Sequence, residues 1–234
     1  MRTAAILPVK RFARAKQRLG ASVEDPLRLA LARAMVADVL LALSHTRAIE
    51  RTIVVTCEQS VALAADDLGA IVVEDVTESG QPAAAGLGVH RALAEGFERV
   101  LCVPGDCPAL DPAELEALLI DEGPTSEQSR TGSSVVIVPD RHGTGTNGLL
   151  LSPPDAIAPS FGPDSCERHR ALALDAGVEV RIARPASLLL DIDTGADLAE
   201  LRARLAELDG GAAQTRAVLT AGGRPTAPSL SASA

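Results

Sequence analysis

The stretch VLCVPGDCPAL, residues 100–110, decides the class of fold. Its first four residues are apolar and two of them are β-branched, a pattern typical of a fully buried strand. Pro104-Gly105 then ends the strand in a turn, so Asp106 is expected at its carboxyl end. Ligands of open α/β sheets bind at that edge, where a carboxylate can hold a metal ion or a ligand hydroxyl. The alternative is that Asp106 caps the next helix, but Asp111-Pro112 already provides a cap and a first-turn proline.

Strand and helix patterns alternate on both sides of this stretch. Apolar runs predict further strands at 3–9, 51–56, 70–74, 134–139, 149–152, 178–182 and 188–194. Capping signals and helical spacing predict helices at 25–45, 60–68, 88–96, 113–119, 166–176 and 195–208, with a loop at 77–87. Short β-α-β connections imply a mostly parallel sheet with helices on both faces. The sequence therefore predicts an α/β fold with a single domain over residues 1–209.

Composition limits the classes of function. The chain of 234 residues is long enough for one well-buried domain. Its formal charge of −9 argues against nucleic acid as a partner. No run of 18 apolar residues and no signal-peptide pattern occurs, so we expect no membrane contact and a cytoplasmic location. The four cysteines lack metal-ligand spacing and are expected to be free thiols.

Two segments have a composition that does not favour a packed core. Residues 121–133 are polar and are expected to form an exposed connection. Residues 210–234 are rich in Ala, Gly, Thr, Ser and Pro, which predicts a disordered tail. The sequence leaves the oligomeric state and any role of this tail open.

A basic segment follows the first predicted strand of this acidic chain. Its cations are Lys10, Arg11, Arg14, Lys16 and Arg18. Lys10 and Lys16 are the only lysines in the sequence. A lysine ammonium is a compact point charge that reaches phosphates readily, so one interpretation is phosphate contact. The other interpretation is a solvated basic loop.

Two further loops offer backbone N–H groups to an anion. Residues 140–148, DRHGTGTNG, contain G-x-G-x-x-G, but a short strand stopped by prolines follows, where a dinucleotide-binding fold requires a helix. A glycine-threonine loop can still bind an anion. Residues 161–165, FGPDS, precede a helix whose first N–H groups form an anion site with Arg168 and His169, although a plain N-cap explains the same pattern.

Two more carboxylates follow the apolar run at 188–194. Alternation along the predicted strand places Asp191 and Asp193 on one side of it. Helix capping by Asp193 or Thr194 accounts for one side chain there, but not for Asp191. Together with Asp106 these carboxylates favour a hard cation, most simply Mg²⁺. Phosphate sites around such an ion are typical of nucleotidyl transfer, and the lack of a Walker A motif argues against a P-loop kinase.

Five segments, in order from about residue 4 to residue 205, resemble the CofC/FbiD family. These guanylyltransferases of coenzyme F-420 biosynthesis have a nucleotidyltransferase fold of the GT-A/MobA-like kind. The segments are LPVK with AKQRL (7–10, 15–19), VPGDCPAL (103–110), DRHGTGTN (140–147), FGPDS (161–165) with Arg168-His169, and DIDT (191–194) with Asp197-Leu198.

The resemblance implies transfer of GMP from GTP to phosphoenolpyruvate, giving enolpyruvyl-2-diphospho-5'-guanosine and pyrophosphate, with Mg²⁺ as cofactor. Archaeal relatives use 2-phospho-L-lactate, and 3-phosphoglycerate is a further alternative acceptor. The implied metal ligands are Asp106, Asp191 and Asp193. The implied catalytic residues are Lys10, Lys16, Arg18 and Asp106. The implied phosphoenolpyruvate contacts are Thr146, Gly162 and Ser165. The phosphate of such an acceptor is already ionised at neutral pH and needs no base, so His142 and His169 are expected to be orienting or structural residues.

The chain departs from the family pattern at one position. Family members carry Leu-Asn where this chain has Leu87-Gly88, so an amide contact to the nucleotide is expected to be missing. Gly86 and Gly88 would compensate by a close approach of the backbone. This departure motivates an alternative from another class, a non-catalytic nucleotide-binding regulatory protein. The three aspartates favour the enzyme, because a pure binding protein has no need of a metal cluster.

Overall fold

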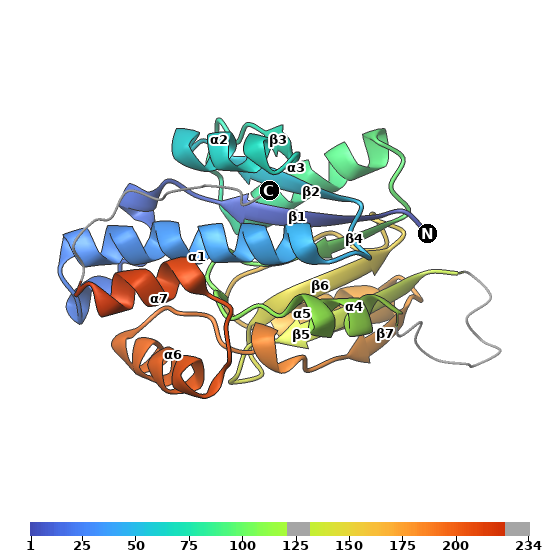
Figure 1. Ribbon diagram of the computed structural model, residues 1–234. Coiled ribbons are helices and arrows are strands. Elements are labelled where there is room, and N and C mark those ends of the chain that lie inside the picture. The colour runs from blue at the N-terminus through green and yellow to red at the C-terminus, as the bar shows by residue number, and fades with distance from the viewer. Residues whose placement is uncertain (121–131, 223–234) are drawn as a thin grey trace.

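The computed structural model of the chain describes residues 1–120 and 132–222 (Figure 1). Within those residues a seven-stranded sheet has the order β3-β2-β1-β4-β6-β5-β7. The strands are β1 (Thr3–Val9), β2 (Arg51–Thr56), β3 (Ile71–Val73), β4 (Arg99–Cys102), β5 (Ser134–Pro139), β6 (Thr146–Ser152) and β7 (Glu179–Ile182). β6 is antiparallel to β4 and β5, while all other neighbours are parallel. The predicted mostly parallel α/β fold is therefore confirmed, and most of the connection predicted at 121–133 lies outside the described residues.

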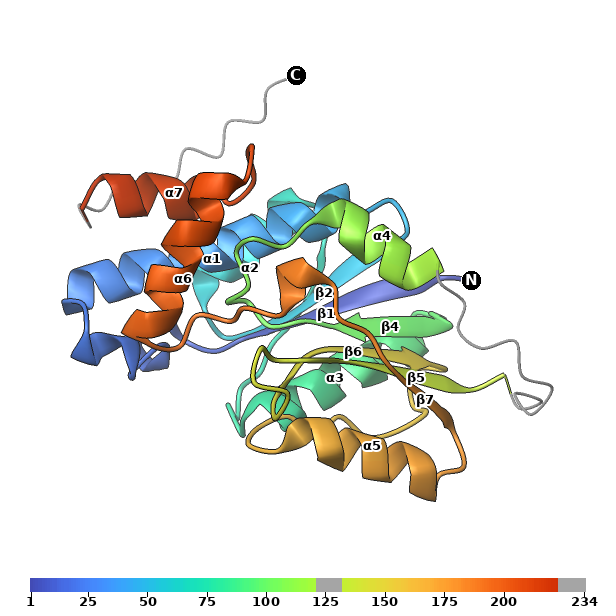
Figure 2. The same ribbon diagram turned by 90° about the horizontal axis from the view of Figure 1, so that it is seen from below.

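Helices cover both faces of the sheet (Figure 2). They are α1 (Asp25–His45), α2 (Gln59–Asp67), α3 (Gln81–Ala94), α4 (Pro112–Ile120), α5 (Ser165–Asp175), α6 (Gly195–Glu207) and α7 (Ala213–Thr220). One core cluster contains Leu7 and Val54 with residues of α1, α2 and α4, and another contains Ile6 and Ile53 with residues of α3 and α5. Successive strand residues point to opposite faces, so the buried strands appear in the sequence as continuous apolar runs. No helix in the described ranges has both the length and the apolar character needed to cross a bilayer.

The segment predicted as a strand at 188–194 is not a strand. It contains the end of the 3-10 helix η3 (Ala186–Leu188) and then an irregular stretch that leads into α6. The Ile192 N–H donates to the carbonyl oxygen of Asp106 at 3.1 Å, so this stretch pairs with the loop after β4 instead of joining the sheet. The Ile192 side chain is fully buried. Asp191 and Asp193, on either side of it, still come to one place.

Helix α3 begins at Gln81, earlier than the predicted start at residue 88. Gly80, with a φ of 106°, precedes it, and Pro82 occupies its first turn. Gly88 is buried in the middle of the helix, and a Cβ added there would lie 2.4 Å from Cγ2 of Ile6. The close approach that Gly88 permits is therefore to β1, and the expectation that it admits a nucleotide is wrong.

This packing predicts opposite effects for two substitutions in α3. Gly88→Ala should lower the free energy of unfolding by about 1–3 kcal/mol, because overpacking against Ile6 exceeds the gain in helix propensity. Gly86→Ala is the matched control, since nothing lies within 4 Å of a Cβ at that position. It should stabilise the protein by up to about 1 kcal/mol. Urea unfolding measures both, and a Gly88→Ala protein as stable as the parent would refute this account of the packing.

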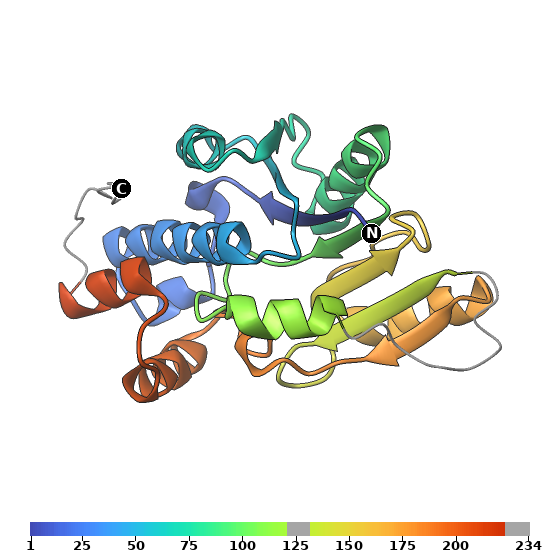
Figure 3. The same ribbon diagram turned by 45° about the vertical axis from the view of Figure 1, so that its right-hand side comes forward.

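The structure describes a helix, α7, within the segment predicted to be a disordered tail. Asp38 in α1 accepts the N–H groups of Gln214 at 3.0 Å and Thr215 at 2.8 Å, and so caps the start of α7. Val218 is buried in a hydrophobic cluster that includes residues of α1 and α6, and Figure 3 shows α7 beside α1. Residues 223–234 lie outside the described residues. Local composition does not reveal α7, because its cap comes from a residue far away in the sequence.

Candidate active site

The three aspartates predicted to bind a metal lie together. Asp106 follows β4, and Asp191 and Asp193 precede α6. One carboxylate oxygen from each can be chosen so that all three lie within 4.8 Å of one another. Oδ1 of Asp106 is buried and has no hydrogen-bond partner among the described residues. An unpartnered buried carboxylate oxygen in an all-oxygen donor set fits a metal ion, so the three residues form a possible metal site.

Asp193 is not used to cap α6. Thr194 is the N-cap, and its side chain accepts the N–H of Asp197, whose carboxylate accepts the Thr194 N–H at 2.7 Å. Arg141, from the loop before β6, pairs with Asp197 at 2.5 Å. The alternative that Asp193 serves as the helix cap is therefore excluded, and its side chain is available to the cluster.

Lys16 neutralises part of the cluster. Its Nζ pairs with Oδ2 of Asp106 and donates to Oδ1 of Asp193 at 2.8 Å. Burial disfavours its charge, but the two carboxylates outweigh burial and raise the pKa of Lys16. Burial and the charge of Asp106 raise the pKa of Asp191. Three ionised carboxylates and one ammonium leave a formal charge of −2, which attracts a cation.

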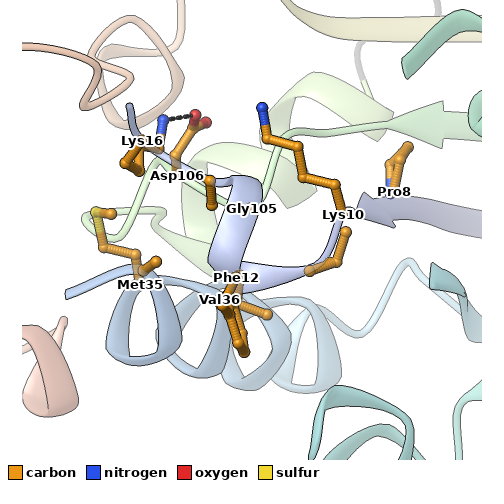
Figure 4. Close-up of a pocket in the computed structure, with 11 residues that line it drawn as sticks. Pro8, Lys10, Phe12, Lys16, Met35, Val36, Gly105 and Asp106 are labelled. Carbon is orange, nitrogen blue, oxygen red and sulfur yellow. Dashed lines mark hydrogen bonds and ion pairs between the residues drawn. The ribbon is translucent and has the colours of Figure 1, made fainter. Parts of the chain in front are cut away.

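A small hollow of about 80 Å³ lies beside Lys16 (Figure 4). Its charged lining groups are Lys10, Lys16 and Asp106, and much of its apolar wall comes from Val9, Phe12, Met35 and Val36. The side chains of Lys10 and Lys16 both extend away from α1 in Figure 4. Arg18 is exposed and does not line this hollow in the described part of the chain. The basic segment therefore brings two of its three predicted catalytic cations to the site.

The three residues predicted to hold the acceptor surround the first turn of α5. Thr146 opens β6 and is buried, and Ser165 is the first residue of α5. Gly162 has a φ of 121°, and its carbonyl accepts the Ser165 N–H at 3.1 Å. The Cys166 N–H donates to the carbonyl of Thr144 at 3.1 Å, which joins this helix start to the loop before β6. The Oγ of Ser165 is buried and lacks a hydrogen-bond partner among the described residues.

The basic residues of α5 support this turn and do not face an anion directly. Arg168 donates to the Ser160 Oγ at 3.0 Å, to the Ser160 carbonyl at 2.9 Å and to the Pro163 carbonyl at 2.5 Å. His169 is fully buried, and burial, followed by the charge of Arg168, lowers its pKa to about 4. His169 is therefore neutral at pH 7. Its burial and its bonds agree with the expected orienting or structural role and do not favour the interpretation of Arg168 and His169 as direct anion ligands.

Asn147, next to Thr146, connects the first turn of α5 to the carboxylates. The sequence patterns did not single out this residue. Its Nδ2 donates to the Leu188 carbonyl at 2.8 Å and to Oδ1 of Asp191 at 3.2 Å. Neighbouring strand residues point to opposite faces, so Thr146 faces α5 while Asn147 faces the carboxylates. Two polar residues at the start of an otherwise apolar strand are the signal that would have identified it.

Comparison with known proteins identifies the fold and the family of this chain. A solved nucleotidyl transferase from Methanothermobacter aligns with 89% of this chain and 99% of its own, with a TM-score of 0.61 and 22% identity. The chain thus has a nucleotidyltransferase fold. It belongs to the family described as guanylyl transferase CofC like, which matches residues 3–216. The family resemblance seen in the sequence is confirmed.

Two curated relatives are similar over most of their length. The phosphoenolpyruvate guanylyltransferase of Conexibacter woesei is 50% identical over 220 residues, which are 94% of this chain and 96% of the relative. The 2-phospho-L-lactate guanylyltransferase of Methanothermobacter thermautotrophicus is 34% identical over 201 residues, 86% of this chain and 84% of the relative.

Proposed function

We propose that this chain transfers the guanylyl group of GTP to phosphoenolpyruvate and releases pyrophosphate. The observation that carries the proposal is the 50% identity, across nearly the whole length of both chains, to a relative named for this reaction. The product would be enolpyruvyl-2-diphospho-5'-guanosine, which the family resemblance connects with coenzyme F-420 biosynthesis. The two sets of residues described above would supply what such a transfer requires, an anion subsite and a cation site.

The reaction needs no base to activate its nucleophile. A phosphate monoester has a second pKa near 6, so the acceptor is already largely a dianion at neutral pH. One of its phosphate oxygens forms a bond to the α-phosphorus of GTP. The bond from that phosphorus to the oxygen bridging the β-phosphate breaks, and pyrophosphate leaves. The chain therefore has to position two anions and reduce their repulsion, which suits a site built of Asp, Lys and backbone donors.

The carboxylates of Asp106, Asp191 and Asp193 would hold Mg²⁺. Bound there, Mg²⁺ supplies charge neutralisation for the phosphates. The unpartnered Oδ1 of Asp106 supports this role, as does Asn147, which orients Asp191. Lys10, Lys16 and Arg18 would contact the triphosphate, with Lys16 the best placed because it already lies at the carboxylates.

The acceptor would sit at the first turn of α5. The hydroxyls of Thr146 and Ser165 and the backbone around Gly162 would bind its phosphate and carboxylate groups. The helix N-terminus favours negative charge, and the buried Oγ of Ser165 offers an O–H donor without a partner in the described residues. Thr146, which is bonded to His169 of α5, and Asn147, which is bonded to Asp191, are neighbours in sequence and so connect this turn to the carboxylates.

Competition between acceptors tests the proposal. Equal concentrations of phosphoenolpyruvate and 2-phospho-L-lactate are supplied with GTP and Mg²⁺, and the two products are separated by mass. We expect the enolpyruvyl product in at least about tenfold excess, equivalent to about 1.4 kcal/mol of discrimination. A second candidate function, transfer to 2-phospho-L-lactate, is supported by the relative named 2-phospho-L-lactate guanylyltransferase and predicts the reverse ratio. A folded protein that forms neither product would favour the regulatory alternative.

A further inference from the structure

Two hydrogen bonds determine which ring nitrogen of His169, in the first turns of α5, carries the proton. The Ser160 backbone N–H lies 2.8 Å from Nε2 of His169, and Oγ1 of Thr146 lies 3.0 Å from Nδ1. A backbone N–H can only donate, so Nε2 must be the unprotonated nitrogen of the ring. The neutral ring then carries its proton on Nδ1 and donates it to Thr146. The tautomer thus follows from the direction of the hydrogen bond that the Ser160 N–H donates.

This tautomer decides what the Thr146 hydroxyl can do. A threonine oxygen accepts through its lone pairs and has one hydrogen to donate. The Nδ1–H group of His169 donates to a lone pair of the Thr146 oxygen. The hydrogen of the Thr146 hydroxyl therefore cannot point at the ring and is directed elsewhere. We propose that His169 is a positioning residue that makes Thr146 an obligate hydrogen-bond donor to the anionic acceptor; this inference rests on the proposed function.

The surroundings of His169 hold the ring in this orientation. Phe161 packs against it edge to face, with the ring centroids 5.2 Å apart and the planes at 75°. Ser165 and His169 are four residues apart on α5 and therefore share the helix face toward β6. Thr146 and Ser165 therefore carry buried hydroxyls on the facing sides of β6 and α5, and a phosphate or carboxylate bound between them would accept from both.

His169 has to be uncharged to orient Thr146 in this way. Burial lowers the pKa of His169 to about 4, so Nε2 keeps its lone pair for Ser160 at neutral pH. An imidazolium would donate from both nitrogens and could not accept the Ser160 N–H. Neutral His169 therefore orients the Thr146 hydroxyl, and the positive charge at the active site comes from other groups.

A pair of substitutions separates the two hydrogen bonds. In His169→Asn, the amide nitrogen stands two bonds from Cβ, as Nδ1 does, and can still donate to Thr146. In His169→Gln, the amide oxygen stands three bonds from Cβ, as Nε2 does, and can accept from Ser160 while Thr146 loses its donor. Both variants lose the ring contact with Phe161, so they are matched for structural damage.

The expected result is a difference in KM for one substrate. His169→Gln should raise the KM for phosphoenolpyruvate at least about tenfold while the KM for GTP stays within about twofold, because a hydrogen bond to a charged group loses its orientation. His169→Asn should keep the KM for phosphoenolpyruvate within about threefold of the parent. In a Thr146→Val background, His169→Gln should add no further change, because Thr146 no longer has a hydroxyl to orient. His45→Gln, at an exposed position at the end of α1, is the control.

Equal KM values for the two variants, or a KM for GTP that rises in parallel, would overturn the proposal. A second measurement is independent of turnover. Nitrogen-15 spectra of the histidine side chains should show His169, assigned by its loss in His169→Asn, with a protonated Nδ1 and a bare Nε2. The opposite tautomer would overturn the proposal even in an active enzyme. Absence of turnover in the wild-type protein would instead refute the proposed function. The spectra, together with calorimetric titration of phosphoenolpyruvate, would still decide the role of His169.

Discussion

Asp106→Asn is expected to lower kcat for guanylyl transfer by about a thousandfold, a loss of about 4 kcal/mol of transition-state stabilisation. Its carboxylate lies at the centre of the site, with Oδ2 paired to Lys16 and Oδ1 buried without a partner among the described residues. Asparagine keeps the shape but removes the charge and one oxygen ligand. Affinity for a divalent cation should therefore fall together with turnover, and titration with Mn²⁺ measures it directly.

The fold should survive this change. The bond that joins the loop after β4 to the segment before α6 uses the backbone carbonyl of Asp106, and its side chain is not involved. Melting curves should therefore be similar for the parent and the variant. Asp67→Asn, at the exposed end of α2, is the matched control and should leave turnover and metal affinity unchanged. Parent-like turnover by Asp106→Asn would remove Asp106 from the mechanism.

Lys16→Met is expected to lower kcat by about a hundredfold or more, because it removes a cation beside the phosphates. Its effect on metal binding should differ from that of Asp106→Asn. The ammonium of Lys16 occupies Asp106 and Asp193, so its removal frees both carboxylates for a metal ion. Affinity for Mn²⁺ should stay the same or become tighter, while the metal-free protein should melt at a lower temperature because the carboxylates lose their counter-ion.

The comparison of the two variants distinguishes the roles of the residues. Asp106→Asn should lose turnover and metal affinity together, whereas Lys16→Met should lose turnover alone. Arg202→Met, at an exposed position on α6, controls for the loss of a positive charge. Weaker Mn²⁺ binding by Lys16→Met would contradict the assignment of Lys16 to the triphosphate and would make it a support of the metal site.

The buried strands and the strand-end aspartates could be predicted because their signals are local. Continuous apolar runs identified β1, β2 and β5, and the Pro-Gly turn placed Asp106 at the correct edge of the sheet. The alternation around Ile192 brought Asp191 and Asp193 together although their segment is irregular. Alternation depends on the local backbone, so it persisted without a sheet partner.

The features that were missed depend on distant partners. The start of α3 was predicted too late because Gly86 and Gly88 are typical of a loop. The packing of Gly88 against Ile6, which explains a glycine inside the helix, is visible only in the structure. Helix α7 depends on a cap from Asp38 in another helix. The role of Asn147 and the bonding partners of His169 depend on groups far away in the sequence or on backbone atoms, which residue type and spacing do not encode.

The most direct test of the central claim is phosphorus-31 spectroscopy of the purified protein with GTP, phosphoenolpyruvate and Mg²⁺. The account predicts that the phosphoenolpyruvate resonance disappears as pyrophosphate and two coupled diphosphate resonances appear in equal amounts. Omission of phosphoenolpyruvate, or replacement of GTP by ATP or CTP, should prevent or strongly slow this change. Folded protein that leaves both substrates intact under these conditions would contradict the claim that this chain is a phosphoenolpyruvate guanylyltransferase.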